Sequence, residues 1–331
     1  MNRPAVLDPA PAREGAGVFA ARRHLLGLEG IAREELLDIL DDAARYRELA
    51  RTHQLPNQEL KGVTVGNAFF EDSTRTRVSF ELAEQRLGAM LVTFTTGGSS
   101  VSKGETLLDT LRVIASMRVD VLVVRHASSG AASYLARHVD AAVVNAGDGR
   151  HEHPTQGLLD IMTLRMAWDG RFEGRRLAIV GDVAHSRVAR SAIHGLNALG
   201  VSVTLAAPAT LLPADVEALG VTVAPTVEDA LAGADAAMAL RIQKERMESG
   251  LLPSLGEYAR VWGVTEARVA LMKPEAVVLH PGPMNRGVEI QPEVADGPRS
   301  VIFDQVENGV AIRCAVLRRC AGRAGAREAR S

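Results

Sequence analysis

The chain has 331 residues, with 38 Lys and Arg against 40 Asp and Glu, so its formal net charge is −2. This near-neutral balance excludes the strongly basic surface of a typical nucleic-acid-binding protein, and no apolar run reaches the roughly 18 residues that span a membrane. Two cysteines, Cys314 and Cys320, cannot build a disulfide framework or a cysteine zinc site, which indicates a reducing compartment, the cytoplasm. At about 150 residues per domain, the length predicts two domains.

Short apolar runs alternate with helical patterns along most of the chain, which is typical of parallel α/β sheets. Expected strands cover residues 63–70, 119–124 and 141–144 in the first half, and 177–180, 201–206, 221–224, 234–240 and 276–279 in the second. Apolar stripes predict one helix through Val188, Ala192, Leu196 and Leu199, and a last helix through Phe303, Val306, Val310, Cys314 and Leu317. The predicted fold is two doubly wound parallel-sheet domains in tandem, with an interdomain helix and a C-terminal helix.

The expected boundaries follow from the same patterns. Residues 1–18 and 321–331 have no periodicity and are predicted to be disordered tails. Residues 19–154 form the first domain, 155–168 the connecting helix and 169–302 the second domain. Residues 303–320 are expected to form a helix that packs back on the first domain.

The most informative motif lies where the first expected strand ends and a helix begins. Ser73 falls at this turn, and the first N–H groups of a helix have no partner within the helix. Such a helix start, with the hydroxyls of Ser73, Thr74 and Thr76 and the guanidinium groups of Arg75 and Arg77, suits a phosphate. The alternative is a surface helix cap whose arginines lie in solvent.

Five segments then occur in one order: Ser73-Thr-Arg-Thr-Arg77, Lys103-Gly-Glu105, Arg125-His126, His153-Pro-Thr-Gln156 and the stretch from His280 to Ile290. Together they resemble the aspartate/ornithine carbamoyltransferase family over roughly residues 20–320, and within it the catalytic chains that use aspartate. The resemblance implies transfer of the carbamoyl group of carbamoyl phosphate to the amine of L-aspartate, a step of pyrimidine biosynthesis, with no cofactor and no metal. Residues 19–154 would bind carbamoyl phosphate, and residues 169–302 would bind aspartate.

The resemblance also assigns residues to carbamoyl phosphate binding and to catalysis. Carbamoyl phosphate would be bound by Ser73, Thr74, Arg75, Thr76, Ser99, Lys103, Arg125, His153, Gln156, Gly282 and Pro283. Of these, Arg75, Thr76, Arg125, His153 and Gln156 would be catalytic. Ser99 and Lys103 would reach the site of a neighbouring subunit, which implies a homotrimer. Without the resemblance, the alternatives are that Arg125 is a surface arginine after a strand and that His153 only caps a helix.

For the acceptor, the resemblance assigns Lys103, Arg187, Arg241 and Gln243 to aspartate binding. Charge placement predicts that Glu71, just before the phosphate motif, pairs with Arg187 and Arg246 of the second domain and so closes the two domains. Two arginines at separate strand ends suit the two carboxylates of an acidic amino acid. On its own, the stretch Leu240-Arg-Ile-Gln-Lys-Glu-Arg246 could also be a solvated charge run. The roles of Arg286 and of Met284-Asn285 stay open.

Other functions remain alternatives. Ornithine carbamoyltransferases typically carry a His-Cys-Leu-Pro motif and a Ser-Met-Gly loop, whereas this chain has His280-Pro-Gly-Pro283 and no cysteine near it. A dinucleotide-binding oxidoreductase would need three glycines after residue 180, and only Gly181 is present. A non-enzymatic relative would be expected to lack a motif residue. His151 and His153 have no third metal ligand beside them. Regulatory or dihydroorotase chains are also conceivable partners.

Overall fold

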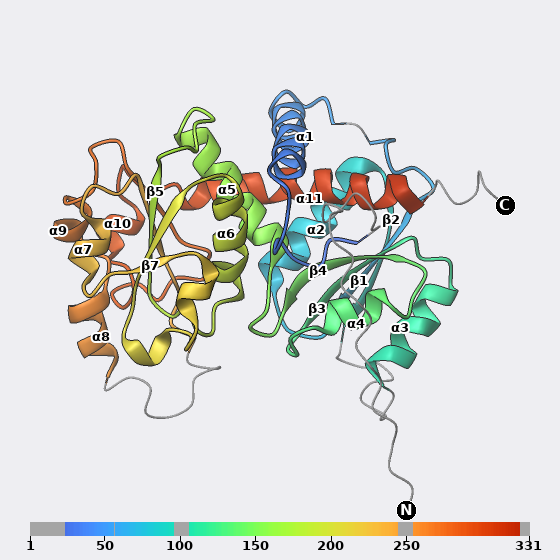
Figure 1. Ribbon diagram of the computed structural model, residues 1–331. Helices are drawn as coiled ribbons and strands as arrows, with labels where there is room; N and C mark the ends of the chain where they lie inside the picture. Colours follow the sequence, from blue (N-terminus) through green and yellow to red (C-terminus); the bar gives the residue numbers. More distant parts are fainter. Residues whose placement is uncertain (1–23, 56, 96–105, 244–253, 325–331) are drawn as a thin grey trace, which may run out of the picture.

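The computed structural model describes residues 24–55, 57–95, 106–243 and 254–324, which form two α/β domains side by side (Figure 1). The first sheet contains β1 (Thr64–Phe69), β2 (Met90–Thr95), β3 (Val121–His126) and β4 (Ala142–Asp148), in the order β2-β1-β3-β4. The second contains β5 (Arg176–Val180), β6 (Ser202–Ala206), β7 (Thr222–Val223), β8 (Ala236–Ala239) and β9 (Val277–Leu279), in the order β7-β6-β5-β8-β9. Every pairing is parallel, which confirms the predicted fold class.

Helices cover the faces of both sheets. Those of the first half are α1 (Arg33–Arg51), α2 (Thr74–Leu87), α3 (Leu107–Ser116), α4 (Ala131–Ala136) and α5 (Pro154–Ala167). Those of the second half are α6 (Arg187–Ala198), α7 (Val227–Leu231), α8 (Leu255–Trp262), α9 (Glu266–Val269), α10 (Pro292–Ala295) and α11 (Ile302–Ala324). Within the described ranges, no helix combines the length and the apolarity that crossing a membrane requires.

Strand β2 is an element that the apolar runs do not predict. It forms the free edge of the first sheet, pairing only with β1 within the described residues, and the side chains of Met90 and Val92 are exposed there. An edge strand is covered less than a central one, so its sequence need not be continuously apolar. The central strands β1, β3 and β4, in contrast, are buried almost throughout and carry the runs that the sequence makes visible.

Helices α5 and α6 join the two domains through a close contact that depends on small residues. A Cβ atom at Gly195 would lie 2.4 Å from Cδ1 of Ile161, and one at Gly157 would lie 2.9 Å from Cβ of Ser191. The two helices can therefore approach only because these positions have no side chain. This contact fixes the ends of α5 and α6 that face the cleft.

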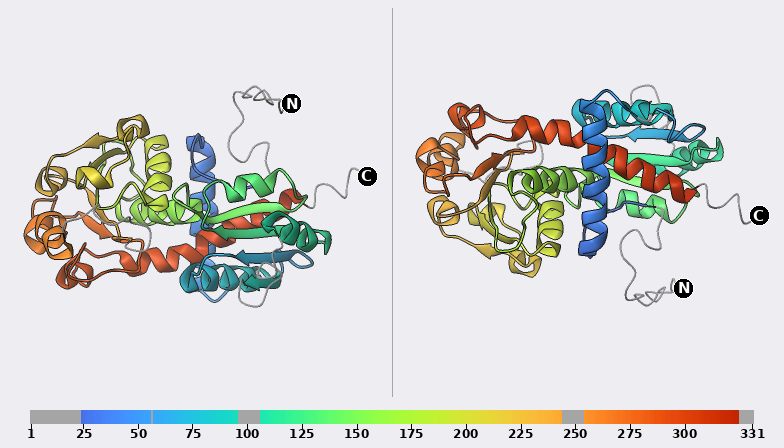
Figure 2. Two further views of the ribbon diagram at one scale, coloured as in Figure 1. Left: turned by 90° about the horizontal axis from the view of Figure 1, so that it is seen from below. Right: turned by 90° about the horizontal axis from the view of Figure 1, so that it is seen from above.

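Helix α11 runs from the second domain across the first, where it packs on α1, α2 and α5 (Figure 2). Its apolar stripe differs from the prediction at the start of the helix: Phe303 is 73% exposed and Val306 is 58% exposed. Burial of the stripe begins only at Val310 and continues through Cys314 and Leu317. The reason is position, because the first turns of α11 lie beside the opening between the domains and the later turns lie over the first domain.

Candidate active site

A cavity of about 440 Å³ lies between the two domains, at the carboxyl ends of strands from both sheets. Parallel α/β sheets bind ligands at this edge. Of the residues predicted for the site, it is lined by Glu71, Ser73, Thr74, Arg75, Thr76, Arg125, His153, Gln156, Arg187, Arg241, Gln243, Gly282 and Pro283. Ser99, Lys103 and Arg246 lie outside the described residues.

The phosphate motif forms the first turn of α2. Ser73 occupies the N-cap position in an extended conformation, and its hydroxyl makes no capping hydrogen bond to the helix. The amides of this turn therefore keep their capacity to donate to a ligand, and the helix dipole adds a partial positive charge. Thr76 is buried in the same turn, and Arg75 lines the cavity.

The cavity lining is strongly cationic. Five arginines, Arg75, Arg125, Arg187, Arg241 and Arg313, face only two carboxylates among the described lining residues, Glu71 and Asp72. Burial, and then the charge of Arg241, lower the pKa of Arg75 below its ordinary value. Cations that destabilise one another in a partly buried site favour an anionic ligand.

Glu71 connects arginines of both domains. Its carboxylate accepts a hydrogen bond from Nη2 of Arg125 at 2.8 Å and one from Nη1 of Arg187 at 3.1 Å, and Nη2 of Arg187 donates a second bond. The two guanidinium groups also meet at Gly147, where a Cβ atom would lie 3.0 Å from Arg187 and 3.1 Å from Arg125. Arg187 is the first residue of α6, where a cation opposes the helix dipole, so the contact with Glu71 offsets that cost.

His153 and Gln156 lie on the first turn of α5. His153 is buried at the N-cap position, and its backbone N–H donates to Oγ of Ser191 at 2.9 Å. Ser191, on α6, donates in turn to Oε2 of Glu152 at 2.7 Å. One turn after His153, Nε2 of Gln156 donates to Oδ1 of Asp160 at 2.9 Å. The second domain therefore holds the backbone of His153 in place through α6.

The loop from His280 to Pro283 forms another wall. The Gly282–Pro283 peptide bond is cis, the isomer that the sequence allowed, and Gly282 has a φ of +61°. The buried ring of His280 accepts from the N–H of Gly282 at Nδ1 (2.8 Å), so Nε2 carries the proton and donates to Glu289 at 3.1 Å. These two hydrogen bonds of the His280 ring hold the loop in its conformation.

Two lining residues, Gln305 and Arg313, are not among those that the sequence predicts. Gln305 accepts from the backbone N–H of His280 at 2.9 Å, and Arg313 lies 5.0 Å from the ring centre of Phe80. Burial lowers the pKa of Arg313 to about 10. Gln305, Gly309 and Arg313 are spaced by four residues and therefore lie on one face of α11. Two polar side chains on one face of an otherwise apolar helix are the sequence pattern that indicates these site residues. Arg286, whose role was open, pairs with Asp296 at 2.6 Å on the surface.

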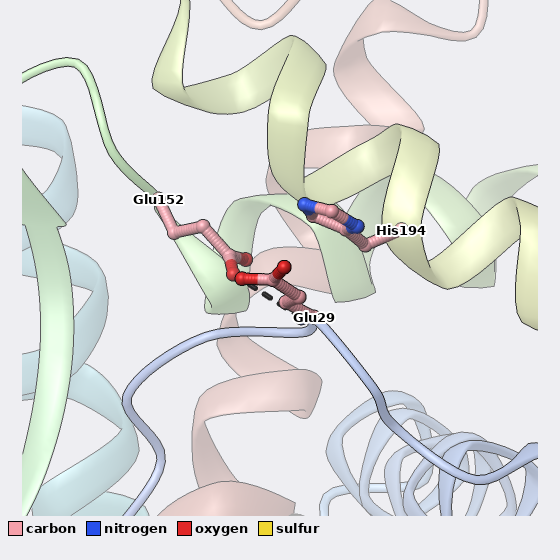
Figure 3. Close-up of side chains that lie close together, drawn as sticks. All are labelled: Glu29, Glu152 and His194. Carbon is pink, nitrogen blue, oxygen red and sulfur yellow. Dashed lines mark hydrogen bonds between the residues drawn. The ribbon is translucent and has the colours of Figure 1, made fainter. Parts of the chain in front are cut away.

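A different group brings three potential metal ligands together among the described residues: Glu29, Glu152 and His194, with ligand atoms within 4.8 Å of one another (Figure 3). The buried carboxylate of Glu152 already accepts hydrogen bonds from the backbone N–H groups of Leu28 (2.7 Å) and Glu29 (3.2 Å), besides the one from Ser191. These bonds tie the segment before α1 to α6. They give Glu152 a structural task next to His153.

Comparisons with known proteins agree with this geometry. The model of the aspartate/ornithine carbamoyltransferase carbamoyl-P binding domain matches residues 23–166, and that of the Asp/Orn binding domain matches residues 173–320. The aspartate carbamoyltransferase catalytic subunit of Gluconobacter oxydans is 57% identical over 298 residues, which cover 90% of this chain and 95% of the relative.

Solved structures give the same result. Aspartate transcarbamoylase of Trypanosoma cruzi in complex with N-(phosphonacetyl)-L-aspartic acid superposes with a TM-score of 0.82 at 31% identity, covering 91% of this chain and 97% of that one. Ornithine carbamoyltransferase of Thermus thermophilus superposes with a TM-score of 0.80 at 28% identity, covering 90% and 99%. With both family models matched in tandem, the chain belongs to the aspartate/ornithine carbamoyltransferase family.

Proposed function

We propose that this chain transfers the carbamoyl group of carbamoyl phosphate to the amine of L-aspartate, giving N-carbamoyl-L-aspartate and phosphate in pyrimidine biosynthesis. The observation that carries the proposal is the interdomain cavity, which combines a phosphate-binding helix start with arginines from both domains. One side suits a phosphate dianion and the other suits a dicarboxylate. A relative with 57% identity carries the name of an aspartate enzyme.

In this proposal the first turn of α2 binds the phosphate group. The amides and hydroxyls of Ser73, Thr74 and Thr76 donate hydrogen bonds, and the guanidinium of Arg75 adds charge-assisted ones. Arg75 acts again when the bond from the carbonyl carbon to the phosphate oxygen breaks, because the leaving group gains negative charge. Removing such a donor from a site that excludes water typically costs about 3 kcal/mol of transition-state stabilisation.

Arg125, His153 and Thr76 polarise the carbonyl group. As the amine nitrogen of aspartate attacks the carbonyl carbon, charge builds on the carbonyl oxygen, and these three residues donate to it. The position of His153 at the start of α5 favours a neutral imidazole, which donates without adding a full charge. Gln156 and the backbone carbonyl groups around Gly282 and Pro283 accept from the NH2 of the carbamoyl group.

The proton of the attacking amine needs an acceptor. The departing phosphate, whose second pKa is about 6, lies beside the new C–N bond and can take it. The balance is complete: one C–N bond forms, one C–O bond breaks, and the amine proton leaves on the phosphate. The task of the protein is to position and stabilise charge rather than to supply a separate base.

Aspartate is held from the second domain by Arg187, Arg241 and Gln243. Each arginine would bind one carboxylate, while Gln243 donates to the backbone of His185 at 3.3 Å and keeps its amide oxygen for the substrate. The pairing of Glu71 with Arg187 suits a role in domain closure, and Arg246 is assigned to the same closure. The arginines of this cavity would repel the positively charged side chain of an acceptor such as ornithine.

The chain would act as a homotrimer in which Ser99 and Lys103 of one subunit complete the phosphate site of its neighbour. Regulatory or dihydroorotase chains are conceivable additional partners. The cytoplasmic location stays a prediction from the sequence.

The test is a carbamoylation assay of the purified chain with carbamoyl phosphate and, in parallel, aspartate or ornithine. We expect N-carbamoyl-L-aspartate to form without added metal or nucleotide, and EDTA to leave the rate unchanged. Faster product formation from ornithine would refute the assignment of Arg187 and Arg241.

A further inference from the structure

Behind the proposed carbamoyl subsite lies a buried carboxylate that the mechanism above does not use. Asp160 is on α5, one turn after Gln156, and is fully buried. Its Oδ1 accepts two hydrogen bonds, from Nε2 of Gln156 at 2.9 Å and from Nε2 of Gln305, on α11, at 2.7 Å. One oxygen atom therefore joins a residue of the candidate site to the helix that crosses both domains.

These two bonds decide which way each amide group points. A side-chain amide can present either its oxygen or its NH2 group, and the two are similar in shape. Because Oδ1 accepts, both glutamines must turn their NH2 groups toward Asp160. Their oxygens then point away from it, and that of Gln305 accepts from the backbone N–H of His280 at 2.9 Å.

We propose that Asp160 is a positioning residue that orients Gln156 and Gln305 as hydrogen-bond acceptors and so lets the site recognise the NH2 of the carbamoyl group. The inference rests on the proposed function. On the α5 side, the oxygen of Gln156 is left to face the carbamoyl NH2. On the loop side, the oxygen of Gln305 anchors His280, the first residue of the loop whose carbonyl groups face the same NH2.

The orientation does not require Asp160 to be ionised. Burial raises the pKa of Asp160 to about 7, although the bonds from the two glutamines and the charge of Arg313 oppose this shift. Oδ2 has no hydrogen-bond partner among the described residues, so a proton there leaves Oδ1 as the acceptor. An asparagine with its NH2 at the Oδ2 position would have the same effect.

The experiment compares two competing ligands, carbamoyl phosphate and acetyl phosphate, in which a methyl group replaces the NH2. We measure KM for carbamoyl phosphate, and Ki for acetyl phosphate as a competitive inhibitor, in the wild type and in Asp160→Leu and Asp160→Asn. In Asp160→Leu, KM should rise about fivefold and Ki should change less than about twofold, because a neutral hydrogen bond is worth about 1 kcal/mol. Asp160→Asn should keep the wild-type ratio of Ki to KM.

A matched control separates positioning from packing. Nδ2 of Asn308, on α11, donates to Oγ1 of Thr163, on α5, at 2.9 Å, a buried contact between the same two helices that does not line the cavity. Thr163→Val should lower the melting temperature and leave the ratio of Ki to KM unchanged. If Asp160→Leu does not fold, Gln305→Met removes the α11 half of the network and should lower the ratio in the same direction.

An equal change of KM and Ki in Asp160→Leu would reduce Asp160 to a structural residue and overturn the proposal. A loss in Asp160→Asn as large as in Asp160→Leu would also overturn it, because charge rather than orientation would then matter. A wild-type chain that forms no N-carbamoyl-L-aspartate would instead refute the proposed function. The two failures are therefore distinguishable.

Discussion

The backbone conformation and the close contacts of a single cavity residue can restrict which side chain that position accepts. Gly282 is one of them, because its φ of +61° lies in the left-handed region and the guanidinium of Arg75 lies directly against it. A Cβ atom at this position would lie 1.8 Å from Nη1 of Arg75. The glycine thus leaves room for the cation that we assign to the phosphate.

Gly282→Ala should therefore impair substrate binding more than stability. The end of the Arg75 side chain can move aside at little cost in folding energy, but it then leaves the phosphate position. We expect KM for carbamoyl phosphate to rise at least about tenfold, the loss of roughly one charge-assisted hydrogen bond. Gly287→Ala is the matched control, because Gly287 has a φ of +79° and, beyond its two chain neighbours, no atom of the described residues lies within 4 Å of its missing Cβ.

Both variants should lose a similar amount of stability, about 1 to 2 kcal/mol for a non-glycine residue at positive φ. Thermal denaturation measures this loss, and initial rates measure KM. A Gly287→Ala variant with the same rise in KM would contradict the role given to the contact between Gly282 and Arg75.

At the scale of elements, the phosphate-binding turn is held by the packing of α2 on the first sheet. Asn67 of β1 donates through Nδ2 to Oε2 of Glu84 of α2 at 3.0 Å, and both side chains are fully buried. Burial raises the pKa of Glu84 to about 8, and the bond from Asn67 opposes the shift. The titratable side chain of Glu84 thus links a helix to a strand next to the site.

Glu84→Gln should make the chain more stable at high pH. The folded pKa of Glu84 lies above the unfolded one, so the folded state holds the proton more tightly and stability falls as pH rises from about 4.5 to 8. Each pKa unit is worth about 1.4 kcal/mol, so the loss reaches several kcal/mol. Glutamine stays neutral and does not incur this loss.

The measurement is the melting temperature of wild type and Glu84→Gln between pH 5 and pH 9. We expect the difference to grow with pH in favour of the variant, whereas Glu34→Gln, at an exposed glutamate of α1, should follow the wild type throughout. A pH-independent difference would show that Glu84 is ionised in the folded protein.

At the scale of the whole molecule, Glu71 bridges the two domains. Arg125 of the first domain keeps a second bond, to the carbonyl oxygen of Ala146 at 3.1 Å, when Glu71 is removed. Arg187 of the second domain makes two bonds to Glu71. Loss of Glu71 should therefore disturb the acceptor side of the cavity more than the carbamoyl side.

In Glu71→Ala, KM for aspartate should rise more than tenfold, and KM for carbamoyl phosphate should rise by a smaller factor. Part of the first effect comes from leaving Arg187 buried without its carboxylate, which is costly for a charged group. Steady-state kinetics with each substrate varied in turn measure both values. Equal changes in the two constants would argue against a role in closure.

The assembly can be tested by mixing inactive subunits. Arg75→Ala and Lys103→Ala should each lower kcat by roughly 10²-fold or more, because every site lacks one cation. If Lys103 acts in the site of a neighbour, dissociating and remixing the two variants creates hybrid trimers with one intact site in about three. Mixing without dissociation is the control, and no recovery after true exchange would place Lys103 in the site of its own chain.

Features of the fold and of the site that depend on neighbouring residues can be predicted from the amino-acid sequence alone. Apolar runs predict the central strands. Polar residues at the strand ends or at the helix starts that follow them, such as Ser73, Arg125, Arg187 and Arg241, are brought to one edge because parallel strands end at the same side of a sheet. The order of motifs identifies the family. Local patterns carry this information because strand ends and helix starts are encoded within a few residues.

Contacts between residues far apart in the chain, in contrast, follow from how the helices and strands pack. Gln305 reaches Asp160 across 145 positions, so no local pattern indicates this partner of Asp160 on α11. Charge placement along the sequence pairs Glu71 with Arg187, 116 positions away, but it does not indicate that Arg125 binds the same carboxylate. The exposure of Phe303 and the edge position of β2 also depend on which elements pack against them. Burial and hydrogen-bond partners depend on the packed arrangement of all the elements, and no single segment of the chain specifies them.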